Sequence, residues 1–398
     1  MWRACDIVTA RPCGRWAGEA PPGFGVRLGA RVAPVLVVNV GSSSFKWSAL
    51  GDGGETLDSV NAPWTPSVDA AAEQVSGALG RIGRPSAIGH RIVHGGPSFS
   101  GPVRVDARVR ALLEALRPLA PQHMGPALAC VDASARLLPD VPQVCAFDTA
   151  FHASMPEEAR LYAVPAAWAE PIALRRYGFH GLSIAHALRR TEALLGVLPP
   201  RVVVCHLGSG ASVTAVREGS SADTSMGYTP LDGLVMATRP GHLDPGAVVA
   251  LAEHLQAAPR ELEARFENEC GLLGLAGTPD LKEVLERADR GDARARTAYA
   301  VYLHALVRTV GGAVGVLGGL DVLVFTGGAG EHSARLRTDA CRAFAFAGVA
   351  LDPDRNATPE GDVDLAQDGA PVRVLRIFAR EDLSVLADVQ RVLDRPGD

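Results

Sequence analysis

The sequence predicts an α/β protein of two related domains, and three observations carry this prediction. Short apolar strands ending in glycine alternate with segments of helical periodicity from Val35 onward. A strand–turn–strand motif occurs twice, as VVNVGSSSFKW around Asn39 and as VCHLGSGASVT around His206. The chain has 398 residues and is 47% hydrophobic, which is enough for two or three domains of ordinary size. We therefore expect an internal duplication whose two turns face each other across a cleft.

Composition and charge exclude several classes of protein. The net charge is −5, the only lysines are Lys46 and Lys282, and no basic block indicates binding to nucleic acid. Seven scattered cysteines without a CxxC pair predict a reducing cytoplasm and no metal cluster. The most apolar stretch, 309–325, is interrupted by glycine pairs and Asp321, so we expect a soluble protein without a membrane span.

Residues 1–33 are predicted to form a poorly ordered extension. They mix Arg, Gly and Pro and contain no apolar run long enough for the core of a signal peptide. The domains are expected to begin after this segment.

The first element after the extension is a buried strand at 35–40, followed by the turn Gly41–Ser44 and a second strand from Phe45. An ordinary hairpin explains such a turn, since Gly and Ser supply turn geometry. The alternative is a phosphate-binding turn made of backbone N–H groups and hydroxyls. The segment is not a Walker loop, because no Gly-Lys-Ser/Thr follows it.

The rest of the chain is also predicted to alternate helices and strands. Helical spacing occurs at 111–120, 181–196 and 295–317, and short buried strands occur at 202–208 and 321–328. Chance similarity between two short strand–turn–strand segments is the alternative to a duplication. A third glycine-rich turn, Thr326–Gly330, completes a set that suits a nucleotide held between two domains.

Four polar clusters bracketed by glycine supply candidate chemistry. They are GHRIVHGG with Arg91, VCAFDTAFH with Asp148, RRYGFHG with His180, and DTSMGYTPLDGLVMATRPGHLDPG with Arg239. Each has a structural alternative: a surface ion pair for Arg91, a helix N-cap for Asp148 and a satisfied loop histidine for His180. These alternatives do not explain why such clusters recur between ordinary apolar elements.

Together with NVGSSSFKWSAL, HLGSGAS, FTGGAGEHS and IFAREDL, these segments resemble the acetate kinase family of the actin and sugar-kinase superfamily, from about Val35 to the C-terminus. The resemblance implies two duplicated actin-like (ribonuclease H-like) domains with a nucleotide cleft between them. The first would comprise 34–147 plus 382–398, and the second, 148–381, would carry the nucleotide site. It further implies a cytoplasmic homodimer that phosphorylates acetate reversibly to acetyl phosphate with Mg²⁺-ATP, with Mn²⁺ as a possible replacement.

The resemblance also assigns roles to residues. The catalytic set is Arg91, Asp148, His180 and Arg239. Acetate would contact Arg91, Val93, Phe179 and Pro230. ATP would contact Lys46, His206, Gly208, Ser209, Gly210, Gly327, Gly328, Gly330 and Glu331. Asn39 and His123 would contact phosphate, and Asn39 and Glu381 would lie at the metal, with Asp148 nearby.

The sequence departs from the family pattern at a few positions. Gln122 stands where the family usually has a leucine lining the methyl pocket, Ser209 replaces Asn, His332 replaces Asn, and Ala237 replaces Gly. We expect Gln122 to point away from the pocket; the alternative is that its amide faces the pocket and finds a partner. A kinase for propionate or another short acid, another phosphoryl donor, and a catalytically silent nucleotide-binding module are the competing functions.

Overall fold

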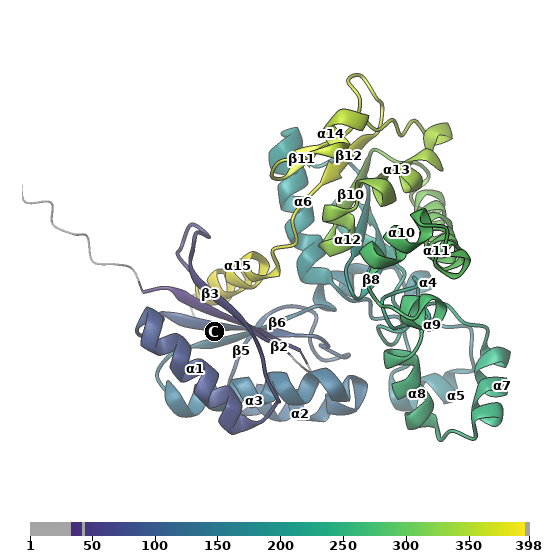
Figure 1. The fold of residues 1–398 in the computed structure, drawn as a ribbon. Coiled ribbons are helices and arrows are strands. Elements are labelled where there is room, and N and C mark those ends of the chain that lie inside the picture. Colours follow the sequence, from purple (N-terminus) through teal and green to yellow (C-terminus); the bar gives the residue numbers. More distant parts are fainter. Residues whose placement is uncertain (1–32, 42–43, 395–398) are drawn as a thin grey trace, which may run out of the picture. The chain divides into compact units, whose positions relative to one another are not determined.

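The structure is a computed structural model that describes residues 33–41 and 44–394 (Figure 1). The predicted extension, except for residue 33, and Ser42 and Ser43 of the first turn lie outside these residues. The described chain contains two sheets of six strands each, which alternate with helices as the sequence predicts.

The first sheet has the order β3-β2-β1-β4-β6-β5. Its strands are β1 (Val35–Val40), β2 (Ser44–Leu50), β3 (Thr56–Pro63), β4 (Ala87–Ile92), β5 (Val103–Arg104) and β6 (Gln143–Phe147). β1, β4 and β6 run parallel and are almost wholly buried, which explains why they are mostly apolar. The Gly41 N–H donates to the Ser44 carbonyl at 2.9 Å, across the β1–β2 hairpin.

The second sheet repeats this arrangement, with the order β9-β8-β7-β10-β12-β11. Its strands are β7 (Arg201–Leu207), β8 (Ala211–Arg217), β9 (Ser220–Thr224), β10 (Val322–Thr326), β11 (Val363–Asp364) and β12 (Arg373–Arg376). Three parallel strands again lie at the centre of two antiparallel neighbours on one side and one on the other. Asn39 and His206 are the penultimate residues of β1 and β7, so the structure confirms the duplication.

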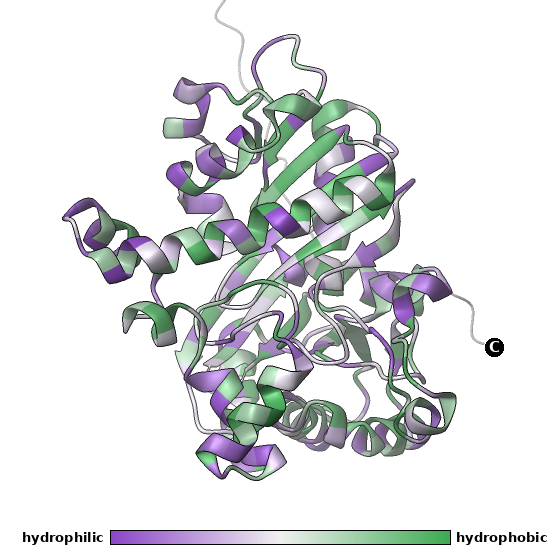
Figure 2. Cartoon of the chain, turned by 90° about the vertical axis from the view of Figure 1, so that its right-hand side faces the viewer, coloured by the Kyte–Doolittle hydropathy of each residue, from purple (hydrophilic) through white to green (hydrophobic). Residues whose placement is uncertain are grey.

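Helices cover both faces of each sheet. In the first, α1 (Val68–Ile82) and α3 (Pro121–Leu137) pack over one face with α2 (Ala107–Ala115) beside them, and α15 (Glu381–Leu393) packs over the other. In the second, α11 (Ala293–Leu317) and α13 (Ala334–Arg342) lie in one core, and α6 (Gly181–Leu195) lies in the core of the opposite face. Figure 2 shows hydrophobic strands and helices that also carry hydrophilic residues, as this layering requires.

The remaining helices all follow β6 in the chain. They are α4 (Glu157–Arg160), α5 (Ala166–Ala169), α7 (Pro245–Leu255), α8 (Pro259–Asn268), α9 (Gly271–Ala276), α10 (Leu281–Asp289), α12 (Gly327–His332) and α14 (Pro353–Ala357). Single 3₁₀ turns occur at 117–119, 150–154, 170–172 and 345–347.

Within the described residues, α11 is the one helix long and apolar enough to cross a membrane. It starts at the N-cap Asp292, which accepts two backbone N–H groups, and ends at Gly318 in the left-handed conformation. Its buried residues recur at helical spacing, as in Tyr302, Leu306 and Val310, and pack into the core of the second sheet. One face of α11 therefore packs in the core of the second sheet, and 28% of its most apolar 18 residues are buried.

Candidate active site

Four predicted site residues meet at the carboxyl ends of the central strands of the first sheet. Arg91, on β4, donates from Nη2 to Asp148 Oδ2 at 2.6 Å and from Nε to Asp148 Oδ1 at 3.1 Å. Its Nη1 donates to Asn39 Oδ1 at 3.0 Å, and Nε lies 3.4 Å from Oε2 of Glu381. The Asn39 amide donates to the same Glu381 oxygen at 3.0 Å.

This cluster rules out two of the structural alternatives. The Arg91 side chain is 19% exposed and Asp148 is 1% exposed, so their ion pair is not a surface pair. The N-cap of the following 3₁₀ turn is Thr149, so Asp148 does not cap it. A bidentate Arg–carboxylate pair of this kind fixes the orientation of the guanidinium group.

Burial and charge set the ionisation of the cluster. Burial alone would lower the pKa of Arg91, but the carboxylates of Asp148 and Glu381 together raise it above its ordinary value. Burial raises the pKa of Asp148 to about 6, and repulsion from Glu381 adds to this while Arg91 opposes it. The pKa of Glu381 is lowered, because Arg91, His206, Asn39 and Lys46 outweigh its burial. The cluster can therefore carry one or two negative charges around a fixed guanidinium.

His180 and His206 form a second, adjoining group. Their rings stack at 4.2 Å, His180 Nδ1 lies 3.0 Å from Ser212 Oγ, and His206 Nδ1 lies 2.8 Å from Ser183 Oγ. His180 precedes α6 with φ 61°, a left-handed conformation that is uncommon for a residue with a side chain. Burial, followed by neighbouring positive charges, lowers the pKa of His180 well below its usual range, and burial also lowers that of His206. Neutral imidazoles that can donate from Nε2 follow from this environment.

Gly210 brings Arg239 into the same group. A Cβ atom added to Gly210 would lie 3.4 Å from Arg239 Nη1 and 3.4 Å from His180 Nε2. The two donor groups therefore converge on the turn between β7 and β8. His123 lies near them as well, because Arg239 and Arg91 add to burial in lowering its pKa to about 4.

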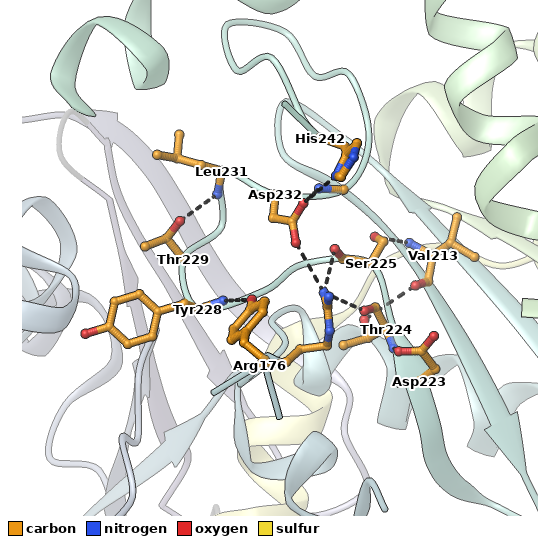
Figure 3. Close-up of polar contacts among 12 residues, drawn as sticks. Arg176, Val213, Asp223, Thr224, Ser225, Tyr228, Thr229, Leu231, Asp232 and His242 are labelled. Carbon is orange, nitrogen blue, oxygen red and sulfur yellow. Dashed lines mark hydrogen bonds and ion pairs between the residues drawn. The ribbon is translucent and has the colours of Figure 1, made fainter. Parts of the chain in front are cut away.

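Arg239 sits on a long loop that Arg176 holds in place (Figure 3). Nη1 of Arg176 donates to the carbonyls of Thr224 and Ser225, both at 3.1 Å, and to Asp232 Oδ2 at 3.3 Å. The loop then carries Arg239 to a position where its Nη1 donates to the Pro230 carbonyl at 3.4 Å. Sequence reasoning quoted the motif that contains Arg176 but missed this role.

The predicted acyl-pocket residues are partly brought together. Phe179 is buried beside His94, and Val93 is half-buried against the core of the second sheet. Pro230 lines a cavity of about 220 Å³ together with Gln122 and His123. Gln122 therefore shares a cavity with Pro230 but not with Val93 or Phe179, and its expected direction away from the acyl pocket stays a prediction.

A larger cavity of about 700 Å³ lies at the carboxyl edge of the second sheet. Three predicted ATP residues, Gly208, Ser209 and Gly328, line it. Gly327 and Gly330 are buried, and Glu331 accepts the N–H groups of Gly327 and Ala379 at 2.8 Å each, which fixes the start of α12. Lys46 lies opposite Asn39 in the β1–β2 pair, and its positive charge helps to lower the pKa of Glu381.

Sequence reasoning missed other residues of this cavity. They include Leu272, Asp280, Lys282, Leu285, Tyr302 and His332. The available signal was Lys282, one of two lysines in the chain, which follows the N-cap Asp280 of α10. A cavity of this size, mostly apolar with a few polar groups, is suited to a nucleoside.

The donor set at Asn39, Asp148 and Glu381 consists of hard oxygen ligands, the kind that Mg²⁺ prefers. Within 33–41 and 44–394, no group of three or more His, Cys, Asp or Glu side chains is arranged to hold a metal ion. A magnesium ion at this position would therefore need phosphate oxygens and water among its ligands.

Comparison with known proteins identifies the family. The model of the acetokinase family matches residues 71–387. An acetate kinase of Trichormus variabilis is 39% identical over 352 residues, covering 86% of this chain and 87% of the relative. The crystal structure of Porphyromonas gingivalis acetate kinase superposes with a TM-score of 0.84 at 32% identity, covering 91% of this chain and 100% of that one. A propionate kinase structure from Francisella tularensis gives a TM-score of 0.84 at 31% identity, covering 90% and 100%. The chain belongs to the acetokinase family.

Proposed function

We propose that this protein transfers the γ-phosphoryl group of ATP to acetate, reversibly, to give acetyl phosphate and ADP. The reaction follows from the family and from its acetate kinase relatives. The observation that supports it within the chain is the convergence of Arg91, Arg239 and His180 around a carboxylate cluster and a glycine turn.

The chemistry needs alignment and neutralisation of charge. Acetate is ionised at pH 7, so no general base is required to activate it. One carboxylate oxygen attacks the γ-phosphorus in line, and the bond to the oxygen that bridges to ADP breaks. Both reactants are anionic, and two guanidinium groups would offset their repulsion.

Each site residue would have its own role in the transfer. Arg91, fixed by Asp148 and Glu381, would orient the acetate and the transferring group. Arg239, whose pKa is lowered because of burial, would place its charge on the equatorial phosphoryl oxygens. Neutral His180 would donate from Nε2 to the same oxygens, and His123 and His206 would contact phosphate nearby.

Magnesium fits the oxygen donors of Asn39, Asp148 and Glu381, and it would supply positive charge to the ATP phosphates when bound. Mn²⁺ would fill the same role. The nucleoside of ATP would occupy the cavity of about 700 Å³, with its phosphates towards the turns at Gly208–Gly210 and Gly327–Gly330.

The domain division and assembly are also proposals. We place the first domain at 34–147 plus 382–398 and the second at 148–381, because α15 contributes to the core beside the first sheet. We propose a cytoplasmic homodimer. Leu161, Trp168 and Ile172 are exposed on neighbouring turns and would suit such an interface. Multi-angle light scattering of the purified protein tests the dimer.

A propionate kinase is the second candidate, because a structure of that name matches the chain as well as an acetate kinase structure does. The deciding assay traps acyl phosphate as the hydroxamate, with acetate and propionate as acceptors and with ATP and other phosphoryl donors. Formation of acetyl hydroxamate that requires ATP is the expected result. A protein that binds ATP but forms no acyl phosphate would be the silent module.

A further inference from the structure

The side chain of Glu331, on α12, joins two segments that are far apart in the sequence. Its Oε1 accepts the backbone N–H of Gly327 at the start of α12, at 2.8 Å. The same oxygen accepts the N–H of Ala379, 48 residues further on, also at 2.8 Å. The Glu331 side chain is only 10% exposed, so water competes little for these two bonds. The carboxylate therefore holds two backbone segments together.

A second side chain, that of Arg337, holds α12 from its other end. Arg337 is 1% exposed, and its Nη1 donates to the carbonyls of Gly330 and Glu331 at 2.8 Å each. Asn356 fixes the guanidinium in turn, because its Oδ1 accepts from Nε at 2.7 Å and its carbonyl accepts from Nη2 at 3.0 Å. Three residues of α12 line the nucleoside cavity: Gly328, Ala329 and His332. The nucleotide side of α12 therefore has a support other than the Glu331 carboxylate.

Ala379 lies in the short segment 377–380, which connects β12 of the second sheet to α15 beside the first. The N–H of Phe378 donates to Oδ1 of Asp362 at 2.9 Å, and the next N–H along the chain, that of Ala379, is the one held by α12. Glu381, the first residue of α15, follows two residues later. The bond from α12 thus anchors the backbone just before Glu381.

Glu381 belongs to the cluster around Arg91. Its Oε2 accepts from the Asn39 amide at 3.0 Å and lies 3.4 Å from Nε of Arg91. A continuous series of contacts therefore runs from α12, at the nucleoside cavity, through Ala379 and Glu381 to Arg91. In the proposed reaction these two ends hold the two substrates, whose reacting atoms must come within about 3–3.5 Å of each other.

We propose, on the basis of the proposed acyl-kinase function, that Glu331 is a positioning residue that sets the distance between the nucleotide and the acyl acceptor. Removing its side chain frees the N–H of Ala379 and with it the backbone that leads to Glu381. Arg337 still holds α12, so the nucleotide still binds. The loss falls on the alignment of the two bound substrates, and therefore on kcat more than on either KM.

Variants of Glu331 in the hydroxamate assay test the proposal. Glu331→Ala should lower kcat by about 100-fold and keep KM for acetate and for ATP within about threefold of wild type. Glu331→Gln keeps an oxygen that accepts both N–H groups and should retain most of the activity. Glu331→Asp, whose carboxylate is one methylene shorter, should fall between the two.

A matched control separates positioning from stability. Asp352 also accepts two backbone N–H groups, those of Asp354 at 2.9 Å and Arg355 at 3.0 Å, but at the start of α14. Asp352→Ala should lower the melting temperature through loss of this cap and keep the wild-type kcat.

Two further measurements locate the effect. In titration calorimetry, the Kd of Mg²⁺-ADP for Glu331→Ala should stay within about threefold of wild type, which is a readout independent of turnover. In a double-mutant cycle, Glu331→Ala should cost little further kcat in the Glu381→Ala background, because Glu331 acts through Glu381.

The outcomes separate the two proposals. A wild type that forms no acyl phosphate with any acid overturns the proposed function. A wild type that forms acetyl phosphate, together with a Glu331→Ala variant of unchanged kcat, overturns this inference alone. So do losses for Glu331→Ala and Glu381→Ala that multiply in the double variant, since Glu331 would then act independently of Glu381. A loss of kcat in Asp352→Ala as large as that in Glu331→Ala would also overturn it.

Discussion

Nη1 of Arg176 lies 3.3 Å from Oδ2 of Asp232, and this pair closes the loop that carries Pro230 and Arg239 (Figure 3). The same nitrogen holds two backbone carbonyls of the loop, so one side chain fixes three points. Arg176 is thus a positioning residue: it reaches the reaction through Arg239.

Replacing Arg176 by Lys should lower kcat for acetate by about 100-fold, since the shorter lysine side chain does not carry its ammonium group to the position of Nη1, and a shift of about 1 Å in a reacting group costs that much. KM for ATP should change little, because neither Arg176 nor the residues that it contacts line the nucleoside cavity. Asp232→Asn, which leaves the two carbonyl contacts in place, should cost less. An Arg176→Lys variant with wild-type kcat would refute the positioning role.

Truncating either site arginine should act mainly on kcat. Arg91→Ala and Arg239→Ala are each expected to lose on the order of 10³-fold, as for removal of an arginine that stabilises a phosphoryl-transfer transition state. The double variant should lose less than the product, because the two groups act together. Arg81→Ala, at an exposed ion pair with Asp58, is the matched control and should retain activity. Steady-state kinetics with acetate and ATP measures these losses. A wild-type kcat in either single variant contradicts the catalytic role of that arginine.

Two adjacent glycines give a matched pair at the nucleoside cavity. Gly327 has φ +77°, and a Cβ there would lie 2.9 Å from the backbone of Leu207; Gly328 has open space around its Cβ position. Gly327→Ala should therefore lower the free energy of unfolding by roughly 1–2 kcal/mol or more. Gly328→Ala should leave the melting temperature unchanged but raise KM for ATP, since only a bound nucleotide would meet the added methyl group. Equal KM values for Gly328→Ala and wild type would place ATP elsewhere.

Buried His90 should make the fold sensitive to acid. Its Nε2 lies 2.8 Å from the terminal amide of Gln143, and burial lowers its pKa from 6.5 to about 4. As pH falls below 6.5, the unfolded chain binds this proton before the folded one, so the stabilisation is complete above pH 6.5 and is lost towards pH 4. The full loss corresponds to about 3 kcal/mol.

Urea unfolding of the wild type and of His90→Gln at pH 7.0 and pH 4.5 measures this effect. The variant lacks the titrating group, so its unfolding free energy should fall less over this interval. Identical losses in the two proteins would show that His90 is not responsible.

The sequence was sufficient to predict the sheets because their central strands are buried on both faces. Such strands are mostly apolar, and the strand–turn–strand around Asn39 reappears around His206 with a polar residue again in the penultimate position. The meeting of Asn39, Arg91, Asp148 and Glu381 was anticipated from family motifs, and the structure brings all four into contact.

Contacts that leave no local pattern in the sequence could not be predicted. Arg176 holds backbone carbonyls, which every residue has, so nothing in the sequence marks its partners. Gln122 and Glu267 lie on separate helices, and only the packing of α3 near α8 places them in one cavity. Their shared position depends on tertiary structure that single-sequence periodicity does not record.

The position of α15 has a consequence for the order in which the protein can fold during synthesis. Val385, Leu386 and Val389 of this helix complete a core with Val35 and Val37 of β1, although the whole second sheet is translated in between. While the ribosome adds those residues, one face of the earlier sheet is exposed and available to chaperones or to other nascent chains. A nonsense mutation just before Glu381 would therefore leave the oldest part of the protein, rather than the newest, without its cover.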